Sequence, residues 1–247
     1  MRLATRAVSH PLCTVRPMPP AGTTVFAPVA IPSHAPLVRV PIPTACGICR
    51  APASAGYSMC TSCRDVAIAL QRPLVPVSAI ALVGTTSALY RALRQYKSGE
   101  PGVAARQSQW LSGVLHRFAE RHLRCVAPDG VDVTVVVPSS RDGRPGPHPF
   151  ESIVRAAACF PMLLDALVPG AGTLAHRRPA PDGYRLRRDV AGRRVLLVDD
   201  VYTSGAHLQT AASALEQAGA RCVQALVVGR FVRSPPAPRA ACPCCER

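Results

Sequence analysis

The chain has 247 residues, enough for one well-packed core and a small additional module. Its formal net charge is +15, from 29 Lys and Arg against 14 Asp and Glu, which favours anionic partners such as nucleotides, phosphates or nucleic acid. The sequence has no apolar stretch of membrane-spanning length and no signal-peptide cleavage pattern. We therefore expect a cytoplasmic protein with no membrane partner.

The N-terminal quarter of the chain divides into two parts. Residues 1–44 are rich in proline and lack acidic residues, which predicts a disordered basic leader. Residues 45–66 contain two C-x2-C pairs separated by ten residues, Cys46 with Cys49 and Cys60 with Cys63. Four thiolates at this spacing can surround one Zn²⁺ tetrahedrally, which predicts a zinc ribbon with structural Zn²⁺. The alternatives are four unligated thiols or a labile disulfide pair.

From residue 75 onward, strand and helix patterns alternate. Four apolar runs predict strands, at 77–84, 132–138, 194–199 and 222–231, with Asp199 and Asp200 where the third strand ends. Helical patterns lie between them, at 85–99, around 111–118, at 150–160 and at 204–219. This alternation predicts an α/β fold with a doubly wound, mostly parallel sheet. The tail, 233–247, is again proline-rich and predicts disorder.

The stretch VLLVDDVYTSGAHL, residues 195–208, contains two adjacent carboxylates and then hydroxyl residues and a glycine. In open α/β sheets, ligands bind at the carboxyl ends of strands. The backbone N–H groups from Thr203 to His207 open a helix and suit a phosphate, whereas Asp199 and Asp200 suit hydroxyl donors. Together they predict a site for a ribose 5-phosphate. The alternative is an ordinary strand followed by a capped helix.

The same stretch resembles the motif that binds 5-phosphoribosyl-1-pyrophosphate (PRPP) in type I phosphoribosyltransferases. The resemblance implies that Asp199 and Asp200 hold the ribose as the catalytic pair, and that Mg²⁺ accompanies PRPP. It also implies a 5-phosphate site made of five consecutive residues, Thr203, Ser204, Gly205, Ala206 and His207. The family usually has threonine where this chain has His207.

Type I phosphoribosyltransferases bind pyrophosphate in the loop after an earlier strand. Here that loop follows the predicted strand at 132–138 and offers Ser139, Ser140, Arg141 and Arg144. A solvated loop is the equal alternative. The basic segment with His176, Arg177 and Arg178 could close over pyrophosphate or remain solvated, and Lys97 could reach a phosphate or simply end its helix in water.

The order of these parts is similar to that of the competence protein F (ComF) family. The cysteine ribbon, the helix ALYRALRQYKSGEPG and the C-terminal motif carry this resemblance over about residues 45–232. It divides the chain into a leader (1–44), a zinc ribbon (45–66), a phosphoribosyltransferase-like domain (75–232) and a tail (233–247). ComF-like proteins usually have Arg-Gly-Phe-Asn-Gln after the pyrophosphate loop, whereas this chain has HPFES, with His148 at the arginine position and Phe150 matching.

Two functions follow from these resemblances. The first is a glycosyltransferase that binds PRPP with Mg²⁺ and transfers the phosphoribosyl group to an unidentified nitrogenous acceptor. The alternative is a non-enzymatic sensor of PRPP or nucleotides, or a DNA-handling accessory of DNA uptake (competence) that contacts single-stranded DNA or a helicase. A zinc-ribbon nucleic-acid protein with an inert α/β domain ranks last, because it leaves the acidic motif unexplained. A homodimer is compatible with each of them.

Overall fold

The structure is a computed structural model that describes residues 45–98, 100–139, 148–175 and 177–233. All of these residues belong to the larger of two compact units of the chain, residues 32–247. The predicted leader lies outside the described residues, as does the predicted tail from residue 234 onward. Within the described part, no helix is both long and apolar enough to cross a membrane.

Helices and strands alternate along the described residues. In chain order they are α1 (Thr61–Leu70), β1 (Val77–Val83), α2 (Ala88–Gln95), α3 (Pro101–Val126), β2 (Val133–Val136), α4 (Pro149–Ala157), β3 (Leu167–Pro169), β4 (Tyr184–Leu186), β5 (Arg194–Tyr202), α5 (Ala206–Gln217) and β6 (Cys222–Phe231). The apolar runs and helical periodicities of the sequence therefore correspond to elements of the expected type.

Four of the strands form one parallel sheet in the order β1-β6-β5-β2. Strand β5 is internal, and its residues from Val195 to Val198 are at most 1% exposed. A continuous apolar run is typical of a strand that is covered on both faces, because side chains on either side then need an apolar neighbour. The predicted α/β fold with a parallel sheet is confirmed.

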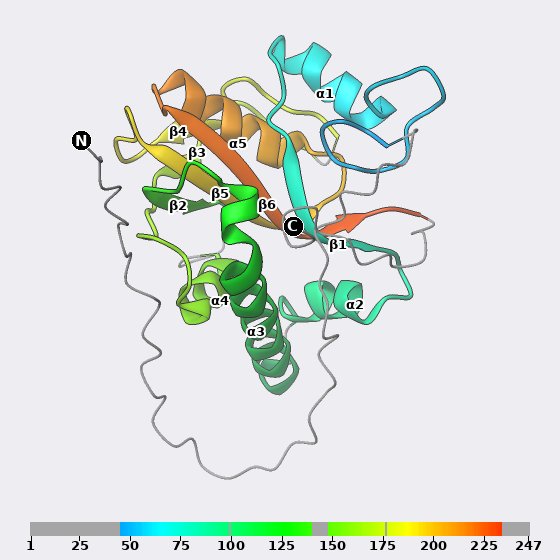
Figure 1. Cartoon of the computed structure of the whole chain (residues 1–247), viewed down its shortest axis with the longest axis vertical. Coiled ribbons are helices and arrows are strands. Elements are labelled where there is room, and N and C mark those ends of the chain that lie inside the picture. Colours follow the sequence, from blue (N-terminus) through cyan, green and yellow to red (C-terminus); the bar gives the residue numbers. More distant parts are fainter. Residues whose placement is uncertain (1–44, 99, 140–147, 176, 234–247) are drawn as a thin grey trace, which may run out of the picture. The chain divides into compact units, whose positions relative to one another are not determined.

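Helices cover both faces of this sheet (Figure 1). Helices α2 and α3 pack against β6, and α4 packs against α3 on the same side. Helix α5 packs against β5 and β6 on the other side, where α1 lies against it. The carboxyl ends of β5 and β2 are therefore adjacent in the sheet and lie between two helical layers.

A short antiparallel ribbon of β3 and β4 lies beside α5 and was not predicted. Each of its strands has only three residues, which is too short for an alternating pattern to appear in the sequence. The ribbon positions Tyr184, whose side chain is buried between the sheet and α5.

The cysteine-containing segment packs on the α/β sheet. The Val77 N–H donates to the Ile48 carbonyl oxygen over 2.8 Å. The buried Gln209 of α5 accepts from the Val75 N–H through Oε1 (3.0 Å) and donates to the Val75 carbonyl through Nε2 (2.9 Å). One hydrophobic core includes the cysteines and the sheet. The predicted division at residue 66 stays a prediction, and the core is continuous across it.

Candidate functional site at the carboxyl end of strand β5

The two adjacent aspartates lie on the part of β5 that extends past its neighbour β2. The last β2–β5 pair is Val136 with Val198, whereas pairing with β6 continues as far as Tyr202 opposite Arg230. The prediction that the strand ends at Asp199 and Asp200 is therefore wrong. Pairing with β6 keeps the strand extended for three residues after Asp199. The two aspartates therefore lie on a part of β5 that has no paired residue on β2.

Asp200 is the more enclosed of the two aspartates, with 6% of its surface exposed. Its Oδ2 accepts a hydrogen bond from the Tyr96 hydroxyl over 2.5 Å and lies 2.6 Å from the Lys97 ammonium. Its Oδ1 accepts from the Val201 N–H over 2.7 Å. The sequence left two alternatives for Lys97, a phosphate ligand or a solvated helix end. The structure shows neither of them, because the Lys97 ammonium contacts a buried carboxylate.

Helix α2 delivers Tyr96 and Lys97 to this position. Ser87 caps the helix by accepting from the Tyr90 N–H over 3.1 Å. On the sheet side, Leu93 packs against Gly229 of β6, where a Cβ would lie only 2.8 Å from Leu93 Cδ1. Glycine at this position therefore lets α2 approach the sheet closely enough to contact Asp200.

The two aspartates have opposite pKa shifts. Burial raises the pKa of Asp199 well above its usual value, and the neighbouring Asp200 carboxylate raises it further. Burial also acts to raise the pKa of Asp200, but the Lys97 ammonium and the Tyr96 hydroxyl outweigh it, and the net shift is downward. One carboxylate is thus stabilised as an anion beside a second, Asp199, for which burial and like charge outweigh the stabilising contacts, which suits binding of hydroxyl donors or a metal cation.

The residues from Thr203 to His207 form a tight turn into α5. Gly205 is the residue before the helix and adopts φ +90°, a conformation that favours glycine. Ser204 is buried, and its Oγ accepts from the Ala206 N–H over 3.4 Å. This turn presents the start of a helix of twelve residues, where the backbone dipole favours an anion.

Arg230 holds the beginning of this turn in place. It is 5% exposed, and its Nη1 donates to the carbonyl oxygens of Tyr202 (3.0 Å) and Thr203 (2.7 Å). Its guanidinium also lies 5.0 Å from the Tyr202 ring centroid. Sequence reasoning missed this residue, because an arginine at the end of an apolar strand gives no signal that it folds inward.

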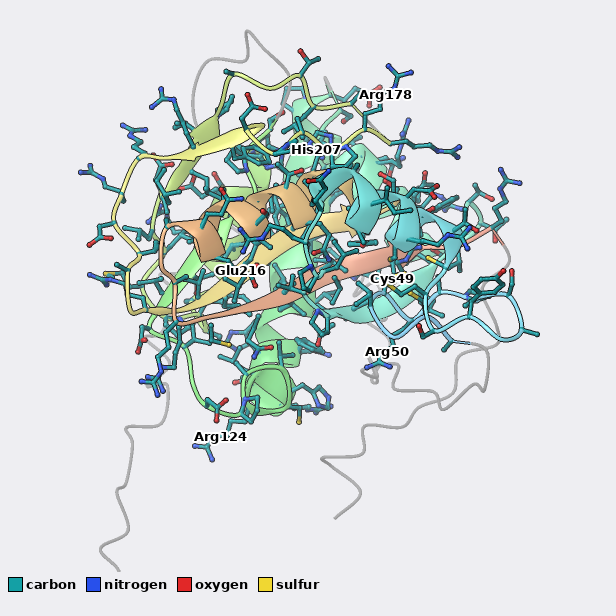
Figure 2. All side chains as sticks on the ribbon, turned by 90° about the horizontal axis from the view of Figure 1, so that it is seen from above. Cys49, Arg50, Arg124, Arg178, His207 and Glu216 are labelled. Carbon is teal, nitrogen blue, oxygen red and sulfur yellow. The ribbon has the colours of Figure 1, made fainter. Side chains whose placement is uncertain are left out.

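Tyr184 connects the turn to the neighbouring strand end. Its hydroxyl donates to the Pro138 carbonyl over 3.0 Å and lies 3.3 Å from His207 Nδ1. Burial and the Asp199 charge raise its pKa. His207 lies at the end of α5 opposite Glu216 (Figure 2). The start of the loop after β2 and the 203–207 turn are therefore joined by one side chain.

The predicted pyrophosphate residues are only partly described. Ser139 is half-buried and directly follows Pro138, beside the carboxyl end of β5. The other three candidates, Ser140, Arg141 and Arg144, lie outside the described residues, as does His176. Arg177 and Arg178 are exposed, and Figure 2 shows the labelled Arg178 side chain pointing outward.

His148 lies within electrostatic reach of Asp200. When its imidazole is protonated, the charge favours the ionised form of Asp200. Its Nδ1 accepts from the Phe150 N–H over 3.2 Å and so caps α4. An arginine at this position would be a permanent cation, whereas an imidazole is a cation only when it is protonated.

The four cysteines Cys46, Cys49, Cys60 and Cys63 form a buried cluster. Their sulfur atoms all lie within 4.8 Å of one another, and those of Cys49 and Cys60 are 3.7 Å apart. A tetrahedron with Zn–S distances of about 2.3 Å has sulfur–sulfur edges of about 3.8 Å. Hydrogen bonding to Cys49 lowers the pKa of Cys46, and hydrogen bonding to Cys46 raises that of Cys63. The cluster fits a structural zinc ion and leaves no open coordination position.

Residues 150–240 match the family model described as the phosphoribosyl transferase domain. Over this stretch the chain is similar to phosphoribosyltransferase domains. The matched stretch contains β5, the 203–207 turn, α5 and β6, whereas α2, which contributes Tyr96 and Lys97, precedes it. The chain has no match among curated protein sequences.

Several solved phosphoribosyltransferase structures are similar at low identity. Adenine phosphoribosyltransferase from Leishmania tarentolae is 14% identical, with 62% of this chain and 91% of that chain covered and a TM-score of 0.37. A phosphoribosyltransferase from Corynebacterium diphtheriae is 18% identical, with 69% of this chain and 92% of that chain covered and a TM-score of 0.31. Orotate phosphoribosyltransferase from Mycobacterium tuberculosis H37Rv, solved with inorganic phosphate, is 18% identical, with 68% of this chain and 75% of that chain covered and a TM-score of 0.33. At these TM-scores the alignments assign no role to individual residues.

Proposed function

We propose that the phosphoribosyltransferase domain binds PRPP with Mg²⁺ and transfers its phosphoribosyl group to a nitrogenous acceptor. The observation that carries the proposal is the pairing of Asp199 and Asp200 with a helix start three residues beyond their strand. The carboxylates accept from the two ribose hydroxyls, and the 203–207 turn receives the 5-phosphate. The acceptor is a nitrogenous nucleophile whose identity is open.

The protein's part in this reaction is to position charge and exclude water. The bond between the anomeric carbon and pyrophosphate breaks, the acceptor nitrogen forms the new bond, and the electron pair leaves with pyrophosphate. Bound Mg²⁺ supplies charge neutralisation for the leaving pyrophosphate, and the all-oxygen donors Asp199 and Asp200 fit such a cation. The buried carboxylates stabilise positive charge that develops on the ribose ring.

Lys97 has a defined role in this proposal. Its ammonium is the cation next to Asp200, and its side chain remains 37% exposed at the open edge of the site. When ribose hydroxyls donate to the carboxylates, the ammonium is released from that contact toward the pyrophosphate of the same ligand. Lys97 thereby supplies positive charge on the side of the site where His148 replaces an arginine.

A ComF-like accessory that senses PRPP or a nucleotide during DNA uptake is the second candidate. One observation favours it: His148 Nδ1 is engaged as a helix cap, so that the site lacks a permanent cation at that position. Weaker binding of the pyrophosphate group still allows PRPP to bind but does not support catalytic transfer of the phosphoribosyl group. In this case single-stranded DNA or a helicase is the partner, and the cysteine cluster and the basic surface contact it.

Calorimetric titration of PRPP with Mg²⁺ tests the leading proposal. We expect micromolar binding by the full-length protein and none by the Asp199→Asn/Asp200→Asn double variant. Absence of binding by the unaltered protein contradicts the transferase and a sensor of PRPP, and leaves only a nucleotide-sensing accessory. If PRPP binds, an assay of pyrophosphate release with a panel of nucleobases separates them, because only the transferase releases pyrophosphate in the presence of its acceptor.

A further inference from the structure

The hydroxyl of Tyr202 lies between the four-cysteine cluster and the 203–207 turn. Tyr202 is the last residue of β5 and is 1% exposed. Its hydroxyl lies 3.5 Å from the Cys63 Sγ. A Cβ placed on Gly205 would lie only 2.1 Å from the same hydroxyl oxygen. One hydroxyl therefore contacts a predicted metal ligand and also lies against the backbone of the turn.

Arg230 provides a second connection between the two sites. Its Nη1 contacts to the Tyr202 and Thr203 carbonyls fix the start of the turn. Its guanidinium also lies 5.0 Å from the ring centroid of Tyr202, the residue whose hydroxyl contacts Cys63. Among the described residues no carboxylate lies within ion-pair distance of Arg230, although it is buried.

Metal occupancy changes the electrostatics of this region. Four thiolates around one Zn²⁺ carry a net charge of −2, whereas four protonated thiols are neutral. A metal-bound thiolate at Cys63 offers the Tyr202 hydroxyl, 3.5 Å away, a charged acceptor. Without the metal, the hydroxyl loses this charged acceptor, and with it an interaction that fixes the orientation of the Tyr202 ring beneath Arg230.

We propose that metal binding at the four-cysteine cluster and anion binding at the 203–207 turn are coupled, with Tyr202 and Arg230 as the positioning residues that connect them. The cluster then sets the affinity of the turn for phosphate in addition to stabilising the fold. The identity of the anion as the 5-phosphate of PRPP rests on the proposed function, whereas the coupling itself concerns any phosphate held by the turn.

The first measurement is the zinc affinity of the full-length protein, by competition with a chromophoric chelator, with and without saturating PRPP and Mg²⁺. We expect zinc to bind about 10-fold more tightly with PRPP present, within the range of about 5- to 150-fold typical of coupled sites. By linkage, PRPP must bind more tightly to the zinc-loaded than to the zinc-depleted protein by the same factor. Equal zinc affinity with and without PRPP overturns the proposal.

A ligand that merely stabilises the fold would also retain zinc, because zinc-free chains unfold more readily. The variant Tyr202→Phe separates the two explanations, since it removes the hydroxyl and keeps the ring. We expect the PRPP-dependent gain in zinc affinity to fall from about 10-fold to about 2-fold, with the thermal transition little changed. The matched control is Tyr57→Phe in the cysteine-containing segment, whose side chain is exposed. An undiminished gain in Tyr202→Phe overturns the proposal.

The same assay distinguishes failure of the coupling from failure of the proposed function. If the unaltered protein does not bind PRPP, the zinc competition is repeated with inorganic phosphate alone as the probe. A phosphate-dependent gain in zinc affinity that Tyr202→Phe removes then supports the coupling without PRPP. A lack of any such gain with phosphate overturns it.

Discussion

An aspartate–cation pair lies near each end of strand β5, and the carboxylates of the two pairs have different surroundings. At the amino end Asp132 accepts three hydrogen bonds from Arg194, from its backbone N–H, Nε and Nη2, and both side chains are 36% exposed. At the carboxyl end Asp200 contacts Lys97 at 2.6 Å with only 9% of its side chain exposed. A second carboxylate, Asp199, adjoins it with no cation of its own among the described ion pairs.

The Asp132–Arg194 pair is a structural charge pair, whereas the carboxylates at the other end of β5 are available to a ligand. The Asp132 carboxylate is already saturated by donors from one partner, which gives it little capacity for a ligand. The Asp199 carboxylate is half-buried beside like charge, an arrangement that is costly unless something else binds there. Parallel sheets place ligand sites at the carboxyl ends of their strands, and the site proposed here lies at such an end.

The largest expected difference between the two ends is in PRPP binding. Asp200→Asn should weaken PRPP binding about 100-fold, because hydrogen bonds to a charged group are worth about 1.5–3 kcal/mol each. Asp132→Asn removes a charged pair at the opposite end of the same strand and should leave the affinity within about 2-fold. Calorimetric titration of both variants measures this. Equal losses in the two variants would contradict the assignment of the site to the carboxyl end.

The glycines that flank β5 give the next largest contrast, in the free energy of unfolding. Gly205→Ala places a Cβ 2.1 Å from the Tyr202 hydroxyl at φ +90°, and should cost about 3 kcal/mol from strain and overpacking. Gly192→Ala has φ +69° but open space around the new Cβ, and should cost about 1 kcal/mol. Urea unfolding of the two variants provides the measurement. Similar costs would mean that the turn relaxes freely.

A smaller effect is expected from Lys97→Met. We predict about 10-fold weaker binding of PRPP and less than about 2-fold change for ribose 5-phosphate, since the ammonium acts on pyrophosphate in the proposed complex. The control is Arg155→Met, which removes a cation from an exposed pair with Glu151 on α4. If both ligands weaken equally, the role of Lys97 is to organise Asp200 rather than to contact pyrophosphate.

The pH dependences of the two ends should have opposite signs. The pKa of Asp132 is lowered to about 2 by hydrogen bonds from Arg194, so its contribution to stability is present above the usual value of 3.8 and is lost as pH falls toward 2. The pKa of Asp199 is raised, so its ionisation destabilises the free protein as pH rises through that pKa. Binding of PRPP with Mg²⁺ favours the ionised form and should therefore release a proton.

Proton release at Asp199 is measurable as a dependence of the binding enthalpy on the ionisation enthalpy of the buffer. We expect PRPP affinity to rise as pH rises above the usual range of an aspartate, because the pKa of Asp199 is raised, and we expect both effects to be lost in Asp199→Asn. The contribution of Asp132 is the smallest effect, because exposed pairs stabilise weakly. It should appear as a modest shift of the acid unfolding midpoint in Asp132→Asn. Binding without proton release would mean that Asp199 keeps its proton and donates to the ligand.

Much of the architecture could be predicted because the signals are local. The apolar run from Val195 to Val198 and the helix start after Gly205 depend only on neighbouring residues, and both are present as predicted. The C-x2-C pairs likewise predict a cluster, because four sulfur atoms within reach of one ion require only two short turns. The three-residue strands β3 and β4 escaped prediction, since strands this short depend on each other for pairing.

The site residues that sequence reasoning missed are those that reach it across the fold. Tyr96, Tyr184 and Arg230 come from three different elements and lie far from the two aspartates along the chain. The glycine at position 229 was the available signal for the approach of α2, since a glycine inside an apolar strand indicates that something packs closely on it.

The sequence by itself determined the order of strands and helices, the paired cysteines and the acidic and hydroxyl motif at the end of β5, because each depends on local spacing and periodicity. The tertiary structure alone decided how far β5 continues past its acidic pair, which cation meets Asp200, and that the cysteine cluster contacts the turn through Tyr202. Those features depend on which strand ends first beside β5 and on which helix packs over it. Such relations arise only when segments distant in the chain pack together.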